Sequence, residues 1–395
     1  METMRWIFKW FTSRTFRQAV EFGSQVRKVR QAQRDLLAPD ALAELDEARR
    51  VFRAQIMTAS GREPIMAAVT VLEEVANRRL KPYPSPSLRE HIEMLLVVAS
   101  VVLACRAFFF QPMAIPSGSA QPTLWGITTE NLLHRPEIKN PTGLKKWAES
   151  WLYGRKYYRV VAEADGQVRD MRDAKTIFPF IKRLTFVVGD KPYHVWFPPE
   201  KFYEYAGLYP GQAFKSGQDM VRFRMTSGDH LFVNTLTYNF RQPRRGETVV
   251  FESRTKEGLI RHTHYIKRLV AMGGEKVQVG DDRHLVIDGK RLDSSTRYFE
   301  NLYAFSPSSR PKTDVWSGHV NDTVARQNGK GGIAPLFPDG KAEFVVRPGH
   351  YLTMGDNTMN SHDSRAWGDF PREYVIGKSG FVFWPLSDRF GWHVD

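Results

Sequence analysis

The pattern of apolar and polar residues predicts a helical region at the start of the chain. Apolar residues recur at helical spacing in ALAELDEARRVFRAQIM, residues 41–57, and in IMAAVTVLEEVANRRL, residues 65–80. The segment KPYPSPS, residues 81–87, ends this pattern, because each proline lacks a backbone donor and restricts the residue before it. We therefore expect residues 1–91 to form a helical N-terminal region that ends in a short linker.

A strongly apolar run follows, IEMLLVVASVVLACRAFFFQPM, residues 92–113. Its apolar part has about the length that crosses a hydrocarbon core, and Arg106 lies toward its end, where the guanidinium reaches the headgroups. Lysines and arginines precede the run, so we expect residues 1–91 to stay in the cytoplasm and the rest of the chain to cross. The run thus predicts a transmembrane helix over 92–112; a buried helix of a soluble core is the alternative.

The remaining residues, 113–395, have the pattern of a mainly β domain. Short runs of β-branched and aromatic residues, such as GETVVF and AEFVVRPGHYLTM, alternate with glycine, aspartate and proline. The segment of about residues 125–227 is more mixed, with a possible helix in GLKKWAESWLYGRKYY and a hairpin in LTFVVGDKPYHVWF. We expect an inserted α+β subdomain there and a loop-rich insertion over about residues 294–343.

Composition limits the classes of partner and cofactor that the chain is expected to bind. A formal net charge of +14 over 395 residues suits either nucleic acid or an anionic lipid surface. No zinc finger, basic zipper or RNA-recognition signature is present, and the apolar run favours lipid over nucleic acid. Cys105 is the only cysteine, which excludes an intramolecular disulfide and a zinc site of the CxxC type. We expect no metal and no cofactor.

Candidate chemistry begins just after the apolar run, where IPSGSAQPTL places Ser117 and Ser119 around a glycine. A serine becomes a strong nucleophile only when a neighbouring base takes its proton. One candidate set of bases is histidine, with His262, His264 and His362 available and Asp363 to orient them. The other is Lys267 in HYIKRLVAMGG, an apolar strand-like segment where burial would lower the lysine pKa. Spacing alone leaves both sets open.

Three stretches, in this order after the apolar run, resemble the characteristic boxes of the type I signal peptidases: IPSGSAQPTL, YIKRLVAMGGEKV and MGDNTMNSHDSRAWG. These enzymes are membrane-anchored Ser/Lys proteases that remove signal peptides from exported proteins. GDHLFVN and RRGETVVF resemble the strands that lie between serine and lysine in that family. The resemblance covers roughly residues 92–124 and 228–385. Any one box would be a weak signal, whereas three in order are a specific one.

The resemblance implies a role for six residues. Ser119 would be the nucleophile and Lys267 the general base, while the Ser117 hydroxyl and the Ser119 amide would form the oxyanion hole. Ser361 would orient the lysine, and Asp363 and Arg365 would form a structural pair near the site. The implied fold is a signal-peptidase-like β barrel or sandwich.

The sequence also departs from the family pattern. Ala120 stands where the family usually has methionine, and MGGEKV replaces the usual proline-glycine-aspartate turn. The inserted segment after Leu124 occupies a place where the family usually continues almost directly into its next strand.

The expected function is a serine endopeptidase of the bacterial inner (cytoplasmic) membrane, with its catalytic domain on the outer face. It would cleave signal peptides from preproteins through an acyl-enzyme, and its partners would be those signal peptides and the lipid bilayer. A Ser/His protease, a cytosolic self-cleaving repressor of the SOS type, and a membrane-anchored scaffold with a degenerate protease domain are the alternatives.

Overall fold

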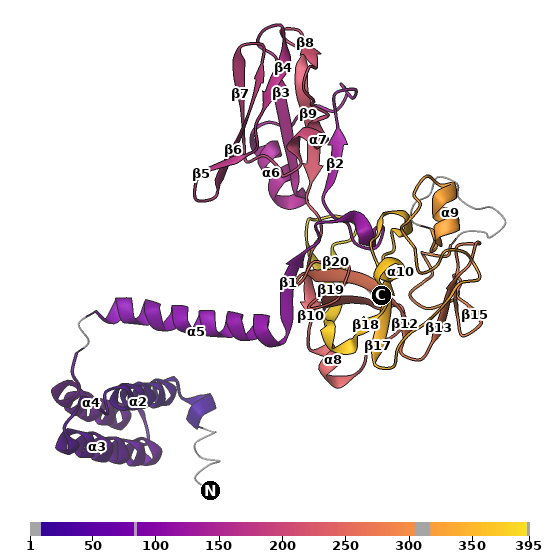
Figure 1. Cartoon of the computed structure of the whole chain (residues 1–395). Coiled ribbons are helices and arrows are strands. Elements are labelled where there is room, and N and C mark those ends of the chain that lie inside the picture. The colour runs from indigo at the N-terminus through magenta and orange to yellow at the C-terminus, as the bar shows by residue number, and fades with distance from the viewer. Residues whose placement is uncertain (1–8, 83–84, 305–316, 393–395) are drawn as a thin grey trace. The chain divides into compact units, whose positions relative to one another are not determined.

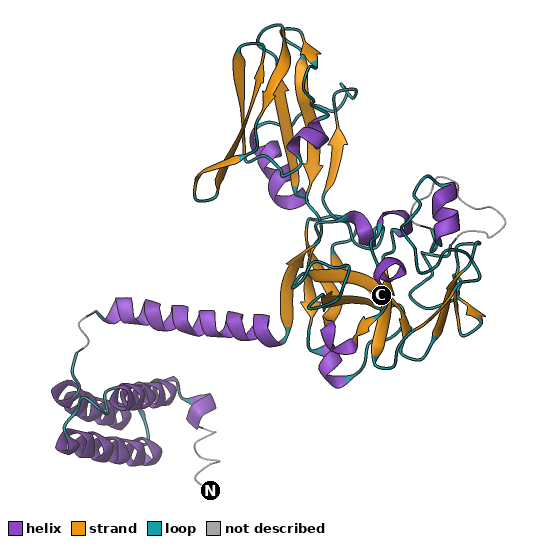
Figure 2. Cartoon of the chain, viewed as in Figure 1, coloured by secondary structure: helices purple, strands orange, loops and turns teal. Residues whose placement is uncertain are grey.

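The computed structural model of the chain describes residues 9–82, 85–304 and 317–392 (Figures 1 and 2). It separates into two compact units, residues 1–99 and 100–395. Helices make up the first unit, whereas strands dominate the second (Figure 2).

Three helices of the first unit form a bundle, α2 (Arg14–Ala32), α3 (Pro39–Thr58) and α4 (Arg62–Arg79). Ser13 caps the start of α2 by accepting a hydrogen bond from the Phe16 amide. The helices bury apolar residues at helical spacing, among them Phe16, Phe52 and Leu72. The spacing noted in the sequence therefore gives each helix one apolar face, and the three faces form a common core.

Helix α5 (Pro86–Phe108) is the one helix within the described ranges that is long and apolar enough to cross a membrane. Every residue of its apolar window is exposed to solvent. The helix begins earlier and ends earlier than the span of 92–112 expected from the sequence. Residues Phe110–Ala114 form strand β1 instead, because their backbone pairs with strand β10, where Phe110 lies opposite Asn234.

The second unit is built on an eight-stranded antiparallel sheet in the order β1-β10-β19-β11-β12-β17-β18, with β20 pairing with β19. The expectation of a mainly β domain is confirmed. A second sheet, β15-β14-β13-β16, packs its apolar side into a core with Phe299, Phe337 and Leu352. The strands after β1 are β10 (His230–Asn234), β11 (Thr248–Glu252), β12 (His264–Met272), β13 (Lys276–Val279), β14 (Leu285–Ile287), β15 (Lys290–Arg291), β16 (Glu343–Val345), β17 (His350–Met354), β18 (Phe370–Pro371), β19 (Val375–Trp384) and β20 (Gly391–Trp392).

Short helices connect these strands. They are η1 (Gly118–Ala120), α8 (Thr237–Phe240), α9 (Asp322–Gln327), η2 (Thr358–Asn360), α10 (Ser364–Trp367) and η3 (Arg372–Tyr374). The expected loop-rich insertion of 294–343 contains α9 between turns, and its residues 305–316 lie outside the described residues. The glycine turn that departs from the family pattern joins β12 to β13, with Gly274 at a φ of 94°.

The inserted segment forms two sheets with a core of their own. One sheet has the order β2-β9-β3 and the other β5-β6-β4-β8, with β7 pairing with β6. Phe186, Phe202 and Phe223 are buried between them. The predicted hairpin is confirmed, since Val188 of β6 pairs with Lys191 of β7 across a turn with Gly189 at a φ of 61°. The elements are β2 (Thr128–Asn131), α6 (Gly143–Tyr153), β3 (Arg155–Val161), β4 (Gly166–Met171), β5 (Lys175–Phe178), β6 (Ile181–Val188), β7 (Lys191–Trp196), α7 (Phe202–Ala206), β8 (Ala213–Phe214) and β9 (Asp219–Thr226).

Candidate active site

Ser119 lies in η1, the single helical turn that follows β1. The turn is fixed at both ends, because the Ile115 amide donates to the Asp229 carbonyl and the Ile127 amide donates to the Pro116 carbonyl. Ala120, at the position where the family has methionine, is buried in a small apolar cluster with Leu124 and Leu231 beneath the turn. The Ser119 side chain is itself largely buried. The nucleophile candidate therefore sits on a tightly packed turn.

Strand β12 places Lys267 against this serine. Lys267 pairs with Val249 of β11, is buried, and brings its Nζ to 2.5 Å from the Ser119 Oγ. Burial lowers the pKa of Lys267 to about 8, since a charged ammonium is poorly solvated inside the protein. The Asp363 and Asp356 carboxylates raise the pKa, but by less than burial lowers it. The amine is therefore neutral in about a tenth of the molecules at pH 7, far more than for an ordinary lysine.

Ser117 lies on the solvent side of the pair. Its side chain is exposed, and its Oγ is 3.3 Å from the Ser119 Oγ. From this position the Ser117 hydroxyl can donate a hydrogen bond to an oxygen held above Ser119. Gly126 packs behind the loop, and a Cβ there would lie 2.2 Å from the Ser117 carbonyl oxygen, so this approach requires glycine.

Ser361 lies near the site but does not make the contact expected of it. Its hydroxyl is buried beside the Asp363 carboxylate, whose pKa it helps to lower. Within the described residues no hydrogen bond joins it to Lys267. A Cβ on Gly355 would meet the Ser361 Oγ at 2.2 Å and the Ser119 carbonyl oxygen at 2.5 Å, so the serines are neighbours across this glycine.

Asp363 and Arg365 form an ion pair, as the family resemblance implied. Arg365 donates from Nε to one Asp363 oxygen at 2.9 Å and from Nη2 to the other at 2.8 Å, and neither side chain is exposed. Arg365 also donates to the Thr358 and Val320 carbonyls, and the Gly355 amide donates to Asp363. The pair therefore joins β17, η2 and the loop before α9.

Sequence reasoning missed a second buried ion pair. Arg268 donates to both oxygens of Asp356, at 2.8 Å from Nε and 2.6 Å from Nη2. Asp356 also accepts from the hydroxyl of Thr123, just after the serine turn. Asp356 lies in the same motif as Ser361, MGDNTMNSHDSRAWG, and Arg268 follows Lys267 directly. The closeness of Asp356 and Arg268 to site residues in the sequence could have pointed to them. The sequence alone does not show that the two side chains contact each other.

Asn357 is a further contact to the serine turn that the sequence did not reveal. Its side-chain amide donates to the Gly118 carbonyl at 3.0 Å, and its backbone amide donates to the Ser119 carbonyl at 3.1 Å. In a trans peptide the carbonyl and the following N–H point in opposite directions. Holding the Gly118 carbonyl therefore turns the Ser119 N–H toward the other side of the turn.

The structure brings none of the three candidate histidines to Ser119. His262 is exposed and lies 3.1 Å from a Glu252 oxygen, and His264 is exposed at the start of β12. His362 is exposed and contacts the Gly258 carbonyl. Among the residues that the structure describes, no group of three His, Cys, Asp or Glu side chains is arranged to hold a metal ion. The chemistry that this geometry offers is a serine hydroxyl next to a buried amine.

Comparison with known proteins gives matches to signal peptidases. Residues 218–384 match the family model described as signal peptidase, peptidase S26. A probable signal peptidase I-2 of Synechocystis sp. is 27% identical over 159 residues, which are 40% of this chain and 56% of that protein. Signal peptidase I of Pseudomonas fluorescens is 28% identical over 185 residues, 40% of this chain and 60% of the relative.

The signal peptidase I of Aquifex aeolicus is 28% identical over 200 residues, 45% of this chain and 77% of that protein. A solved signal peptidase I structure from Enterococcus faecalis V583 aligns with 35% of this chain and 97% of its own, at 22% identity and a TM-score of 0.24. The chain thus spans less than two thirds of the length of the first of these relatives. The inserted segment before residue 218 lies outside the match to the family model.

Proposed function

Because this chain is a relative of the type I signal peptidases, we propose that it is a serine endopeptidase that removes signal peptides from exported preproteins. The observation that carries the proposal is the 2.5 Å approach of the Lys267 Nζ to the Ser119 Oγ in a buried setting. The lowered pKa of Lys267 supports it, because a neutral amine accepts the hydroxyl proton.

In the proposed reaction the Ser119 Oγ attacks the carbonyl carbon of the scissile peptide while its proton passes to the Lys267 Nζ. The new C–O bond leaves a negative charge on the former carbonyl oxygen, which accepts hydrogen bonds from the Ser117 hydroxyl and the Ser119 amide. The C–N bond then breaks, and the leaving amine takes the proton from Lys267. Water activated by the same amine hydrolyses the ester and frees Ser119.

The substrate in this proposal is an extended peptide that pairs with β1. In the order of the large sheet β1 is an edge strand, and it runs directly into the serine turn. A peptide that added itself to this edge would align its backbone with the approach to Ser119. Small side chains near the cleavage point would let the peptide lie close to the strand.

Membrane anchoring by α5 is the proposed reason why preproteins reach the site. Ser119 follows the end of α5 by eleven residues of chain, so the reaction would take place near the membrane surface. A signal peptide in the same bilayer would then meet the site at a high local concentration. The proposed orientation has residues 1–91 in the cytoplasm of a bacterial cell and the catalytic domain outside the inner membrane. Protease added to intact spheroplasts should digest residues 113–395 but spare the helical bundle; protection of the catalytic part would contradict this orientation.

The experiment for the activity uses the purified full chain in lipid vesicles with a model preprotein. We expect one cleavage, with the new N-terminus at the end of the signal peptide, and none with Ser119→Ala. Ser216→Ala, an exposed serine of the inserted segment, is the matched control and should cleave normally. Cleavage by the Ser119 variant would contradict the proposed nucleophile, and a preprotein left intact by the unaltered chain would favour the scaffold alternative.

A further inference from the structure

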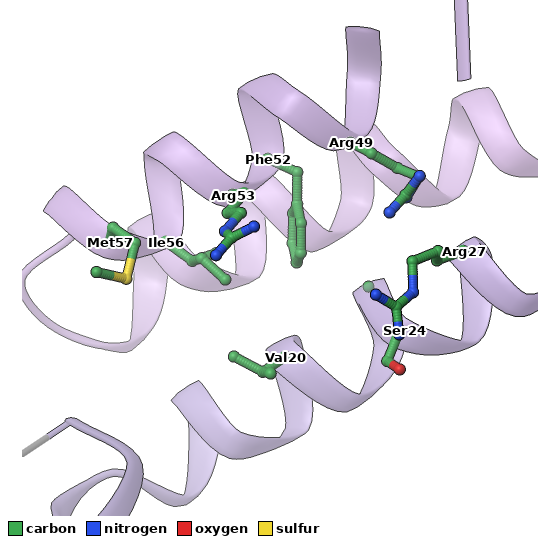
Figure 3. A pocket seen from close by; sticks show the side chains of 9 residues that line it. Val20, Ser24, Arg27, Arg49, Phe52, Arg53, Ile56 and Met57 are labelled. Carbon is green, nitrogen blue, oxygen red and sulfur yellow. The ribbon is translucent and has the colours of Figure 1, made fainter. Parts of the chain in front are cut away.

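A cavity between α2 and α3 of the N-terminal bundle is lined by three arginines. Its volume is about 320 Å³, and its lining includes Arg27 of α2 with Arg49 and Arg53 of α3. Figure 3 shows Arg49 of α3 and Arg27 of α2 directed toward each other across the gap between the two helices, with Ser24 beside Arg27 and Arg53 on the other side of Phe52. The catalytic residues are all in the other unit of the chain, so this cavity is a separate feature.

The floor of the cavity is apolar. Phe52 and Ile56 lie there, and both belong to the core of the bundle. Gly23 lines the same space, and a Cβ at that position would come within 2.7 Å of the Phe52 ring. The cavity therefore combines cationic walls with an apolar base, a combination that suits an anionic group attached to a hydrocarbon chain.

The positive charge at this helix interface is poorly compensated. Arg27 and Arg53 make no hydrogen bond or ion pair with any residue that the structure describes. Arg49 lies 3.3 Å from Asp46, but the same carboxylate also pairs with Arg30 of α2. Guanidinium groups that face one another across two helices repel, and one shared carboxylate offsets only part of this repulsion. A bound anion would offset the rest.

We propose that this cavity binds the phosphate of an anionic phospholipid. The phosphate oxygens accept hydrogen bonds from Arg27, Arg49 and Arg53, because a guanidinium matches the geometry of phosphate oxygens. The start of the acyl region lies against Phe52 and Ile56. A lipid is favoured over a free phosphate because the floor is apolar, and because α4 is joined by only six residues, 80–85, to the apolar helix α5.

Binding to the full chain in a neutral detergent tests the proposal. The probe is dihexanoyl phosphatidylglycerol, titrated by calorimetry, with dihexanoyl phosphatidylcholine, glycerol 1-phosphate and inorganic phosphate as separate arms. We expect saturable binding of the phosphatidylglycerol and markedly weaker binding in the other arms. Equal binding of the phosphatidylcholine would overturn the proposal of an anion site, and equal binding of inorganic phosphate or glycerol 1-phosphate would overturn the lipid as its source.

Arg27→Gln with Arg53→Gln is the variant for this test, and Arg14→Gln with Arg62→Gln is its control. All four side chains are exposed arginines of the bundle, and the two pairs remove the same charge. The first pair should weaken phosphatidylglycerol binding by about tenfold or more, whereas the control should change it by less than about twofold. Equal weakening by both pairs would show that only net charge attracts the lipid and would overturn the site.

A stability measurement separates lost binding from lost folding. Without lipid, the Arg27 and Arg53 variant should unfold at the same temperature as the unaltered chain or at a higher one, because the change relieves repulsion and breaks no contact. With phosphatidylglycerol, the unaltered chain should gain thermal stability and the variant should not. A variant that is less stable without lipid but gains as much from lipid would contradict the proposal.

Discussion

Ser119 and Lys267 are 148 positions apart in the chain, yet the Ser119 Oγ and the Lys267 Nζ lie 2.5 Å from each other. Two sets of contacts produce this approach. The pairing of β12 with β11 places Lys267 on the sheet, and Asn357 holds the serine turn by the carbonyls of Gly118 and Ser119. The amine is buried as a result, and burial is the largest cause of its lowered pKa, with a smaller contribution from the positive charge of Arg365.

The proposed base predicts the pH dependence of cleavage. With a pKa of about 8, Lys267 is neutral in about a tenth of the molecules at pH 7 and in about nine tenths at pH 9. The kcat/KM for a signal-peptide substrate should therefore rise with pH, with an apparent pKa of about 8, and then level off. A rising limb near about 6.5 would instead indicate a histidine base.

The same lysine should reduce the stability of the folded chain. Lowering its pKa from 10.5 to about 8 corresponds to about 3 kcal/mol at pH values where the amine is charged. Lys267→Met should therefore be inactive but more stable than the unaltered chain at pH 7. Between pH 8 and 10.5 Lys267 keeps its proton in the unfolded chain but has released it in the folded chain, so the unaltered chain becomes more stable as the pH rises. The difference in unfolding free energy between Lys267→Met and the unaltered chain should therefore shrink over this range.

Denaturant unfolding at several pH values checks this prediction. Lys290→Met is the matched control, because Lys290 is exposed on β15 and its replacement should give no such pH-dependent gain. A Lys267 variant that is less stable than the unaltered chain at pH 7 would mean that the buried amine is a net stabilising contact.

Asn357 is predicted to position the oxyanion hole. Its side chain fixes the Gly118 carbonyl and thereby the direction of the Ser119 N–H. Asn357→Ala should lower kcat by about tenfold to a hundredfold with little change in KM, since the N–H is needed most in the transition state. Asn301→Ala, an exposed asparagine, serves as the control. A change confined to KM would assign Asn357 to substrate binding instead.

The pair of Asp356 and Arg268 is predicted to maintain the fold around the site. Both side chains are buried, so removing one charge leaves the other without its partner. Asp356→Asn should lower the free energy of unfolding by about 3–5 kcal/mol, measured by denaturant titration. Asp388→Asn, at an exposed position, should change it little. Equal stability of the two variants would show that the ion pair is dispensable.

Much of the architecture could be predicted from local patterns. Helical spacing in residues 41–57 and 65–80, and β-branched runs after residue 113, reflect which side of each element is buried. The end of α5 could not be predicted in this way. Phe109 and Phe110 continue the apolar run, and only the long-range pairing with β10 turns Phe110 into a strand.

The motifs indicated some of the residues that lie together at the candidate site. The three family motifs contain Ser119, Lys267, Asp363 and Arg365. The structure brings Ser119 together with Lys267, and Asp363 together with Arg365. The contact of Thr123 with Asp356 joins residues 233 positions apart, and no local pattern indicates it. The direction of the Ser361 hydroxyl likewise depends on packing around Asp363 rather than on spacing in the chain.

The rate of preprotein cleavage by variants at the candidate bases tests the central claim most directly. At about pH 8, Lys267→Met and Lys267→Arg should each lose cleavage by about a thousandfold or more, because neither side chain accepts the serine proton. His262→Ala and His264→Ala should keep nearly full activity. Retained cleavage in the lysine variants together with its loss in a histidine variant would contradict the account.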